Sequence, residues 1–355
     1  MIQNKLLQLL LAPFSLLYGF GVSMRDFLYR KELLKGIEFD LPVIAVGNLS
    51  IGGAGKSPHI EYLIRLLKDY LYIATLSRGY KRKTKGFLPV ELHHNALQVG
   101  DEPMQFKQKF PDILVSVCES RAFAIPRILL KAPNTQVILL DDAFQHLSVK
   151  PGLNILLTEY GRPFTRDFLL PSGRLREWRS AYRRADMIIV SKCPNQISDE
   201  ERAAFRQEIQ PYAHQKLYFS YYRYRPPYLL LDPKKQRLLD AKMDVLLICA
   251  IAGTKYLLDY LYPQVQEVKT LEYEDHHTFT KFDIGHLAQT FQKIESDRKI
   301  ILTTEKDAMR LLVHRDFIIE QKLPIFVLPV TVAFHDADGP RFDQDIRDFL
   351  LNFKA

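Results

Sequence analysis

The stretch "VGNLSIGGAGKSPH", Val46–His59, decides the fold. It continues an apolar run, "FDLPVIAVGN", that is typical of a buried strand, and it leads into "SPHIEYLIRLLKDY", which has the spacing of an amphipathic helix. Pro58 would lie in the first turn of that helix, where no backbone N–H is needed. A glycine-rich turn between a strand and a helix is the setting of a phosphate-binding loop.

Within this stretch, "SIGGAGKS" follows the pattern G-x-x-x-x-G-K-[ST], except that Ser50 replaces the first glycine. The glycines allow a tight turn whose N–H groups point inward, and the helix N-terminus adds partial positive charge. Lys56 would reach the β- and γ-phosphates. The predicted nucleotide-binding residues are Gly52, Gly53, Ala54, Gly55, Lys56 and Ser57. The alternative is a flexible strand–helix turn that carries a surface lysine.

A phosphate-binding loop of this kind needs an acidic partner on the metal side. The stretch "VILLDDAFQH" supplies Asp141 and Asp142 after four apolar residues, where a carboxylate can hold Mg²⁺. Two solvated loop aspartates are the alternative. No N-K-x-D-like element for guanine follows a predicted strand, so ATP is the favoured nucleotide. The predicted Mg²⁺ ligands are Ser57, Asp141, Asp142 and Glu177.

Buried strands alternating with helices predict an α/β fold: a P-loop NTPase-like lobe with a mostly parallel sheet, and a smaller α/β lobe. We expect strands to link the two lobes, with an apolar helix in front of them. The predicted parts are an N-terminal membrane-contacting helix (1–36), a P-loop kinase domain (37–215), linker strands (216–235 and 324–340), a smaller α/β domain (236–323) and a C-terminal helix (341–355).

The N-terminal segment from Leu6 to Val22 carries no charge and is followed by several basic residues. It is shorter than the roughly 20 apolar residues of a membrane-spanning helix, and Pro13, Gly19 and Gly21 interrupt it. Two interpretations stay open: the segment lies in a membrane interface, or it packs on the protein's own core. The whole chain of 355 residues has a formal net charge of +8, which favours an anionic partner of some kind.

Two basic clusters also follow predicted strands. One is "SRGYKRKTKG", which contains Arg78, and the other is "LPSGRLREWRSAYRR", which contains Arg174 and Arg176. Either could be a solvated charged face. Beside a nucleotide site, however, they suit a second, anionic substrate. We therefore predict that Arg78, Arg174 and Arg176 bind the acceptor.

Taken together, the motifs resemble those of the tetraacyldisaccharide 4′-kinases of lipid A synthesis, a family of membrane-associated P-loop kinases. The matching stretches are "VGNLSIGGAGKSP", "LSRGY", "GDEP", "LLDDAFQH", "LPSGRLRE", "EDHHTFT" and "TTEKDAMR", in the family's order. The family's loop also lacks the first glycine. Lys81 and Trp178 depart from the family pattern, in loops that the resemblance assigns to acceptor contacts.

The resemblance implies a reaction in which the γ-phosphate of MgATP passes to the 4′-hydroxyl of tetraacyldisaccharide 1-phosphate. It places the enzyme at the cytoplasmic face of the bacterial inner membrane, as a peripheral or monotopic protein. We infer no nucleic-acid partner and no obligate protein partner. The alternatives are a membrane-recruited P-loop ATPase acting on another anionic partner such as nucleic acid, and a nucleotide-gated membrane-binding module without transfer chemistry.

A sugar hydroxyl is a poor nucleophile at neutral pH, so transfer needs a base. Asp101, in "GDEP" at an expected loop–helix junction, is the candidate. From the residues alone, His276 and His277 suit a polar loop, but the resemblance gives His276 a functional role. We expect Asp101 in the P-loop lobe and His276 in the smaller lobe, so that the catalytic pair forms when the lobes close.

Overall fold

The computed structural model describes residues 5–354 and divides them into two compact units. Unit 1 contains the chain up to Arg78, Ile113–Tyr222 and the chain from Val332 onward. Unit 2 contains Gly79–Asp112 and Arg223–Thr331. The chain therefore passes between the units four times: after Arg78, after Asp112, within β8 (Lys216–Tyr224) and within β15 (Val330–Phe334). The last two crossings fall in the ranges predicted as linker strands.

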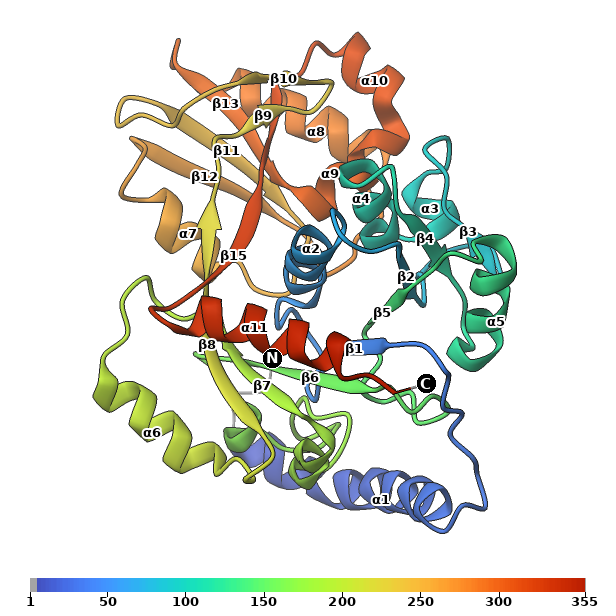
Figure 1. The fold of residues 1–355 in the computed structure, drawn as a ribbon. Helices are drawn as coiled ribbons and strands as arrows, with labels where there is room; N and C mark the ends of the chain where they lie inside the picture. The colour runs from blue at the N-terminus through green and yellow to red at the C-terminus, as the bar shows by residue number, and fades with distance from the viewer. Residues whose placement is uncertain (1–4, 355) are drawn as a thin grey trace. The chain divides into compact units, whose positions relative to one another are not determined.

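Unit 1 is built on a mostly parallel sheet (Figure 1). Its strand order is β15-β8-β7-β6-β1-β5-β2-β4, and the pairs from β8 to β4 are parallel. Buried aliphatic side chains fill the central strands on both faces, as expected for a parallel sheet between helices. The strands not yet bounded are β1 (Val43–Asn48), β2 (Ile73–Ser77), β4 (Leu114–Val117), β5 (Val137–Asp141), β6 (Leu153–Glu159) and β7 (Met187–Ser191).

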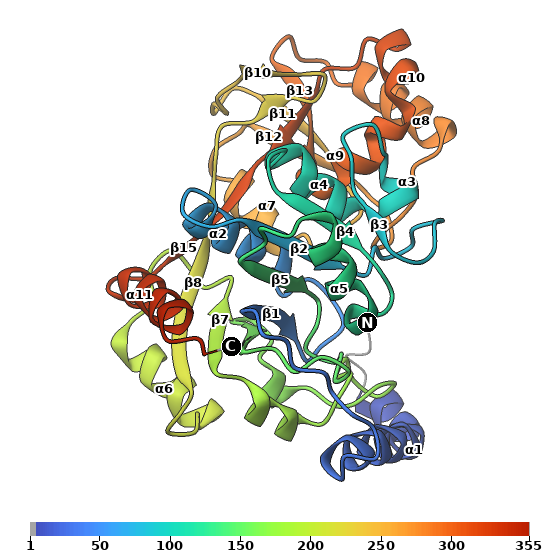
Figure 2. The same ribbon diagram turned by 45° about the vertical axis from the view of Figure 1, so that its right-hand side comes forward.

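The helices of unit 1 include the one predicted after the glycine-rich loop and the one predicted at the C-terminus. In both ribbon views the C-terminal helix lies next to β8 (Figures 1 and 2), and the rings of Phe342 and Tyr218 are 5.3 Å apart. The helices are α1 (Lys5–Arg30), α2 (Lys56–Leu67), α5 (Arg121–Lys131), α6 (Asp199–Ile209) and α11 (Asp338–Leu351), with 3-10 turns at Phe164–Arg166 and Arg179–Arg184.

Helix α1 runs without a break through Pro13 and through the two glycines that interrupt the apolar segment. Within the described residues it is the one helix long and apolar enough to cross a membrane, by length and composition alone. Little of it is covered by the rest of the chain, and leucine and phenylalanine side chains along it are exposed.

Unit 2 has its own sheet, in the order β10-β9-β14-β13-β11-β12. The pairs from β14 to β12 are parallel, whereas β9 is antiparallel to its neighbours. The sheet strands are β9 (Tyr228–Leu229), β10 (Asp232–Gln236), β11 (Asp244–Cys249), β12 (Glu267–Glu272), β13 (Lys299–Thr304) and β14 (Ile325–Leu328). The α/β class predicted for this part of the chain is thus confirmed.

The helices of unit 2 come from two separate stretches of the chain. One stretch, Gly79–Asp112, was assigned by the sequence to the P-loop domain, but it packs with unit 2. It contributes β3 (Leu88–Pro89), α3 (Ala96–Val99) and α4 (Asp101–Lys109). The other stretch, Arg223–Thr331, contributes α7 (Lys255–Leu261), α8 (Lys281–Gln292), α9 (Glu305–Leu311), a 3-10 turn at Leu312–His314 and α10 (Arg315–Glu320). Thr280 caps α8 as predicted, accepting the N–H of Asp283.

Candidate active site

The glycine-rich loop joins β1 to α2, and Gly55 is the residue on which its shape depends most. Gly55 has φ of 89°, a left-handed conformation, and a Cβ there would lie 2.5 Å from the hydroxyl oxygen of Tyr222. Its carbonyl oxygen lies 2.8 Å from Nδ1 of His59, whose Nε2 lies 3.0 Å from Oγ of Ser220. Burial lowers the pKa of His59 to about 4, so the neutral ring donates to Gly55 through Nδ1.

Four polar side chains meet where β1 and its neighbour β5 end, beside the N-terminus of α2. Lys56 Nζ lies 3.1 Å from Asn48 Oδ1 and 3.6 Å from Asp142 Oδ1. Arg176 donates to both carboxylate oxygens of Asp142, at 2.8 and 3.1 Å, and to Asn48 Oδ1 at 2.7 Å. Cations and a helix N-terminus in one place form a site suited to phosphate groups.

The Asp142 carboxylate is held as an anion by these neighbours. Burial raises its pKa, but the charges of Lys56, Arg176 and Arg121 outweigh burial and hold the pKa well below its usual range. Arg121 is fully buried and donates to the carbonyl oxygens of Cys118 and Asp141. Burial lowers the pKa of Arg121 to about 10, so it stays charged at neutral pH.

The predicted Mg²⁺ ligands divide into two groups. Ser57 is in the first turn of α2, Asp141 is the last residue of β5 and Asp142 follows it. Their hydroxyl and carboxylate oxygens are hard donors that suit Mg²⁺. Glu177 is completely buried, and its two oxygens accept from Arg25 and Arg184. Within residues 5–354, no group of three acidic, histidine or cysteine side chains could hold a metal without help. Mg²⁺ commonly completes its shell with substrate phosphates.

The three arginines predicted to bind the acceptor have different surroundings. Arg176 belongs to the phosphate cluster, whereas Arg174 is paired with Asp167 at 3.0 Å. Arg78 is exposed at the end of β2, and its charge helps to lower the pKa values of Arg121 and His146. Arg78 therefore contributes positive potential to the edge of the sheet where Asp141 and Asp142 lie.

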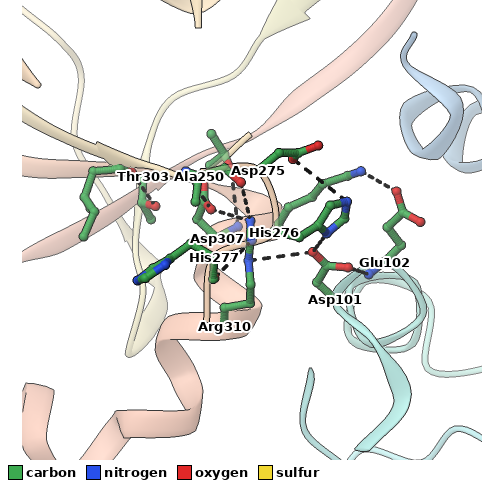
Figure 3. A network of polar contacts seen from close by, with 12 residues as sticks. Asp101, Glu102, Ala250, Asp275, His276, His277, Thr303, Asp307 and Arg310 are labelled. Atoms are coloured by element: carbon green, nitrogen blue, oxygen red, sulfur yellow. Dashed lines mark hydrogen bonds and ion pairs between the residues drawn. The ribbon is translucent and has the colours of Figure 1, made fainter. Parts of the chain in front are cut away.

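A second polar site lies wholly within unit 2. Asp101 is the first residue of α4, and its Oδ2 lies 3.1 Å from Nδ1 of His276 (Figure 3). Both residues belong to the same compact unit. The expectation that Asp101 lies in the P-loop lobe, and His276 in the other, is therefore wrong, because the segment carrying Asp101 packs with unit 2. Asp101 and His276 are in contact although they are 175 positions apart in the sequence.

Cations surround Asp101 on the side of α9. Burial raises its pKa, but the hydrogen bond from His276 and the charges of Lys306 and Arg310 hold the pKa well below its usual range. Arg310 Nε lies 3.7 Å from the same Oδ2 that faces His276. Lys306 also forms an ion pair with Glu102, the next residue of α4.

Residues of the "TTEKDAMR" motif hold the backbone around His276 through hydrogen bonds. Arg310 donates to the carbonyl oxygens of Ala250 and His277, at 3.0 and 3.3 Å. Asp307, fully buried, accepts from Arg310 and from the N–H of Ala250 (Figure 3). The N–H of His276 donates to the same carbonyl of Ala250. This network supports the left-handed conformation of His276, which has φ of 57°.

Asp101 and His276, which we call the dyad, face a surface hollow in unit 2. Its lining includes Tyr80, Lys81, Leu97, Asp101, His276 and Arg310. The Tyr80 ring lies against the His276 imidazole, with centroids 4.7 Å apart, and Lys81 Nζ lies 3.2 Å from the His276 carbonyl oxygen. A group entering this hollow meets a hydrogen-bonded carboxylate–imidazole pair, which can accept a proton.

Comparison with known proteins identifies the family of the chain. A family model described as "Tetraacyldisaccharide-1-P 4′-kinase" matches residues 7–350. The chain belongs to this family. A tetraacyldisaccharide 4′-kinase of Flavobacterium johnsoniae is 46% identical, with 97% of this chain and 98% of that protein covered. One from Phocaeicola vulgatus is 40% identical, covering 96% and 94%.

Among solved structures, a family member from Aquifex aeolicus in complex with ATP has a TM-score of 0.72 against this chain. It is 28% identical, and the match covers 97% of this chain and 99% of that one. A neighbour at this level supports the same fold across both units.

Three residues of the two sites were not singled out from the sequence. Asn48 accepts from both Lys56 and Arg176, and a polar residue between the buried strand and the glycine-rich loop was the available signal. Arg121 and Arg310 are charged residues buried in helices that follow strands. Their positions looked like ordinary helical surface, because burial of a single arginine leaves no periodic signal.

Proposed function

We propose that the protein transfers the γ-phosphate of ATP to the 4′-hydroxyl of tetraacyldisaccharide 1-phosphate. The observation that carries this proposal is the cluster of Lys56, Asp142 and Arg176 at the N-terminus of α2, in a chain whose relatives bear the name of this reaction. The hydrogen-bonded pair in unit 2 supplies the base that such a transfer needs.

Unit 1 binds the nucleotide in this proposal. The N–H groups of residues 52–57 surround the phosphates, and Lys56 neutralises charge that develops on the transferred group. Arg176, held against Asp142, adds a second cation. Ser57, Asp141 and Asp142 would hold Mg²⁺, which when bound neutralises the phosphate oxygens. Glu177 was also predicted as a ligand, but its pairing with Arg25 and Arg184 favours a structural role.

Unit 2 handles the proton of the acceptor hydroxyl. As the sugar oxygen forms its bond to the γ-phosphorus, the bond from phosphorus to the β–γ bridging oxygen breaks and ADP leaves. The hydroxyl proton passes to the pair formed by Asp101 and His276. A carboxylate with a low pKa is a weak base by itself. The histidine at 3.1 Å offers a second place for the proton, so the two groups act as one base.

The acceptor is anionic and carries four acyl chains, which suits two further features. Arg78, Arg174 and Arg176 are the candidates for binding the 1-phosphate, and Arg174 would have to exchange Asp167 for it. Helix α1, with its exposed apolar side chains, suits the surface of a membrane. We place the protein on the cytoplasmic face of the inner membrane, where ATP and an embedded acceptor meet.

The direct test is phosphoryl transfer by the purified full-length protein. With γ-labelled ATP, Mg²⁺ and acceptor in mixed micelles, we expect label in the acceptor and a new phosphorus correlation to the 4′ proton by NMR. Omission of Mg²⁺ should abolish transfer, and a 4′-deoxy acceptor is the matched control. Label released only as inorganic phosphate, or release stimulated by added RNA, would contradict the proposal.

A further inference from the structure

Helix α1 has a polar face as well as an apolar one, and the polar face is turned toward the segment Leu169–Trp178. Ser15 Oγ donates to the Leu169 carbonyl oxygen at 3.0 Å. The Tyr18 hydroxyl donates to the carbonyl oxygen of Arg176 at 2.9 Å, and Trp178 Nε1 donates to Ser23 Oγ at 2.9 Å. These side chains recur every three to five residues, so they share one side of the helix.

The segment that α1 binds is part of the phosphate site. Tyr18 holds the backbone of Arg176, and the guanidinium of the same residue binds Asp142 and Asn48. Asn48 Oδ1 also accepts from Lys56. Only Arg176 and Asn48 therefore separate a hydroxyl of the apolar helix from the lysine of the glycine-rich loop.

A second connection runs through a buried carboxylate. Glu177, completely buried, accepts from Arg25 of α1 and from Arg184. Arg184 also donates to the carbonyl oxygen of Phe144, two residues beyond Asp142, at 3.0 Å. Loss of Arg25 would leave a buried charge with one partner fewer, which the surrounding segment could relieve only by moving.

We propose that α1 is a positioning element of the phosphate site: through Tyr18 and Arg25 it holds the segment Arg176–Glu177 so that Arg176 stays against Asp142 and Asn48. Attachment to lipid is then one of two roles of the helix, and the other is to complete the site for transfer. The inference rests on the proposed function of that site. It goes beyond membrane attachment, because an anchor alone would need no contact with Arg176.

Two glycines in α1 provide a matched pair for the test. A Cβ on Gly19 would lie 2.4 Å from Cζ2 of Trp178 and 2.9 Å from Cδ1 of Leu169, whereas a Cβ on Gly21 would meet nothing within 4 Å. Both residues are inside the same helix, and alanine is the better helix former at either position. Gly19→Ala therefore pushes the helix away from Trp178, and Gly21→Ala makes the same chemical change without that contact.

The experiment uses the full chain, with Tyr18→Phe as a milder variant that removes a single hydroxyl. Trp178 is the only tryptophan of the chain, so tryptophan fluorescence reports directly on how α1 packs against it. We expect Gly19→Ala to shift the emission to longer wavelength and to increase iodide quenching. It should also lower kcat by about tenfold to a hundredfold at saturating acceptor, as small misplacements do. Tyr18→Phe should lower kcat several-fold, and both variants should still sediment with anionic vesicles.

Gly21→Ala should match the wild type in fluorescence, kcat and sedimentation. Wild-type kcat in Gly19→Ala and Tyr18→Phe would overturn the inference, as would a loss that tracks vesicle binding and disappears at saturating acceptor. A wild-type protein that transfers no phosphate in the same assay would overturn the proposed function and the inference with it. If the wild type is active and the three variants are equal to it, only the inference fails.

Discussion

Each of the two sites contains a carboxylate whose pKa lies well below its usual range, but the neighbours that lower it differ in kind. Asp142 in unit 1 is surrounded by the basic side chains of Lys56, Arg176 and Arg121, whose charges lower its pKa. Asp101 in unit 2 is hydrogen-bonded to His276, a residue type that gains and loses protons in that range. In the proposed mechanism, the carboxylate with the low pKa is a fixed anion at one site and half of a proton-transfer pair at the other.

The two sites also share a strained backbone. Asp142 has φ of 49° and His276 has φ of 57°, both in the left-handed region that residues other than glycine seldom adopt. Each is supported by buried arginine: Arg121 donates to the carbonyl of Asp141, and Arg310 to the carbonyl of His277. The cost of such conformations is tolerated where the surrounding structure fixes them, which is typical of functional sites.

The contrast predicts that changes in unit 1 damage nucleotide binding and transfer together. Lys56→Ala should lower kcat by on the order of 10³-fold or more and weaken ATP binding, because the transferred phosphate loses its positioned cation. Steady-state kinetics and binding of a fluorescent ATP analogue measure the two effects. Lys68→Ala, at the other end of α2, is the control and should leave both unchanged. Normal turnover in Lys56→Ala would remove the glycine-rich loop from the mechanism.

A smaller effect should appear in the stability of unit 1, because it contains a buried histidine, His59, whose pKa is lowered. The pKa of His59 is about 4 in the folded chain, against an ordinary value near 6.5. Between these values the unfolded chain binds a proton that the folded chain does not, so the free energy of unfolding falls as the pH falls. From pH 7 to pH 5 the loss due to His59 is about 2 kcal/mol.

In urea unfolding, His59→Gln should remove the part of the pH dependence of the free energy of unfolding that is due to His59. Burial and the charge of Arg121 also lower the pKa of His146 to about 4. The part of the pH dependence that is due to His146 should therefore remain in this variant. The exposed His286 offers a control substitution, His286→Gln, which should leave the pH dependence as it is. The same pH dependence in His59→Gln and the wild type would show that Gly55 does not depend on a neutral imidazole.

Several of the residues that meet in unit 1 could be singled out because they are local in sequence. Residues 52–57 form the turn and the start of α2. Asp141 ends the strand that pairs with β1, where it is opposite Val46, and Asp142 follows directly. Spacing alone puts such residues at one edge of a parallel sheet. The sequence singled out Arg176 but not its pairing with Asp142, which depends on the path of a loop without regular structure.

The dyad was predicted as two residues but placed wrongly. The alternation of strands and helices continues smoothly through Gly79–Asp112, so the sequence offers no sign that this stretch packs with unit 2. Glycines at 79 and 100 hold it in a tight arrangement, with a Cβ on Gly100 only 3.1 Å from the Gly79 Cα. Contacts between residues this far apart depend on packing, which neither spacing nor periodicity encodes.

The central claim is that Asp101 and His276 act as one base, and a double-mutant cycle tests it most directly. Each of Asp101→Asn and His276→Ala should lower kcat by on the order of 10²- to 10⁴-fold while ATP affinity stays unchanged. The double variant should be little worse than the poorer single variant, as for residues that work as a unit. His286→Ala, an exposed histidine of the same unit, is the control. Losses that multiply in the double variant, or near-normal turnover in Asp101→Asn, would contradict the claim.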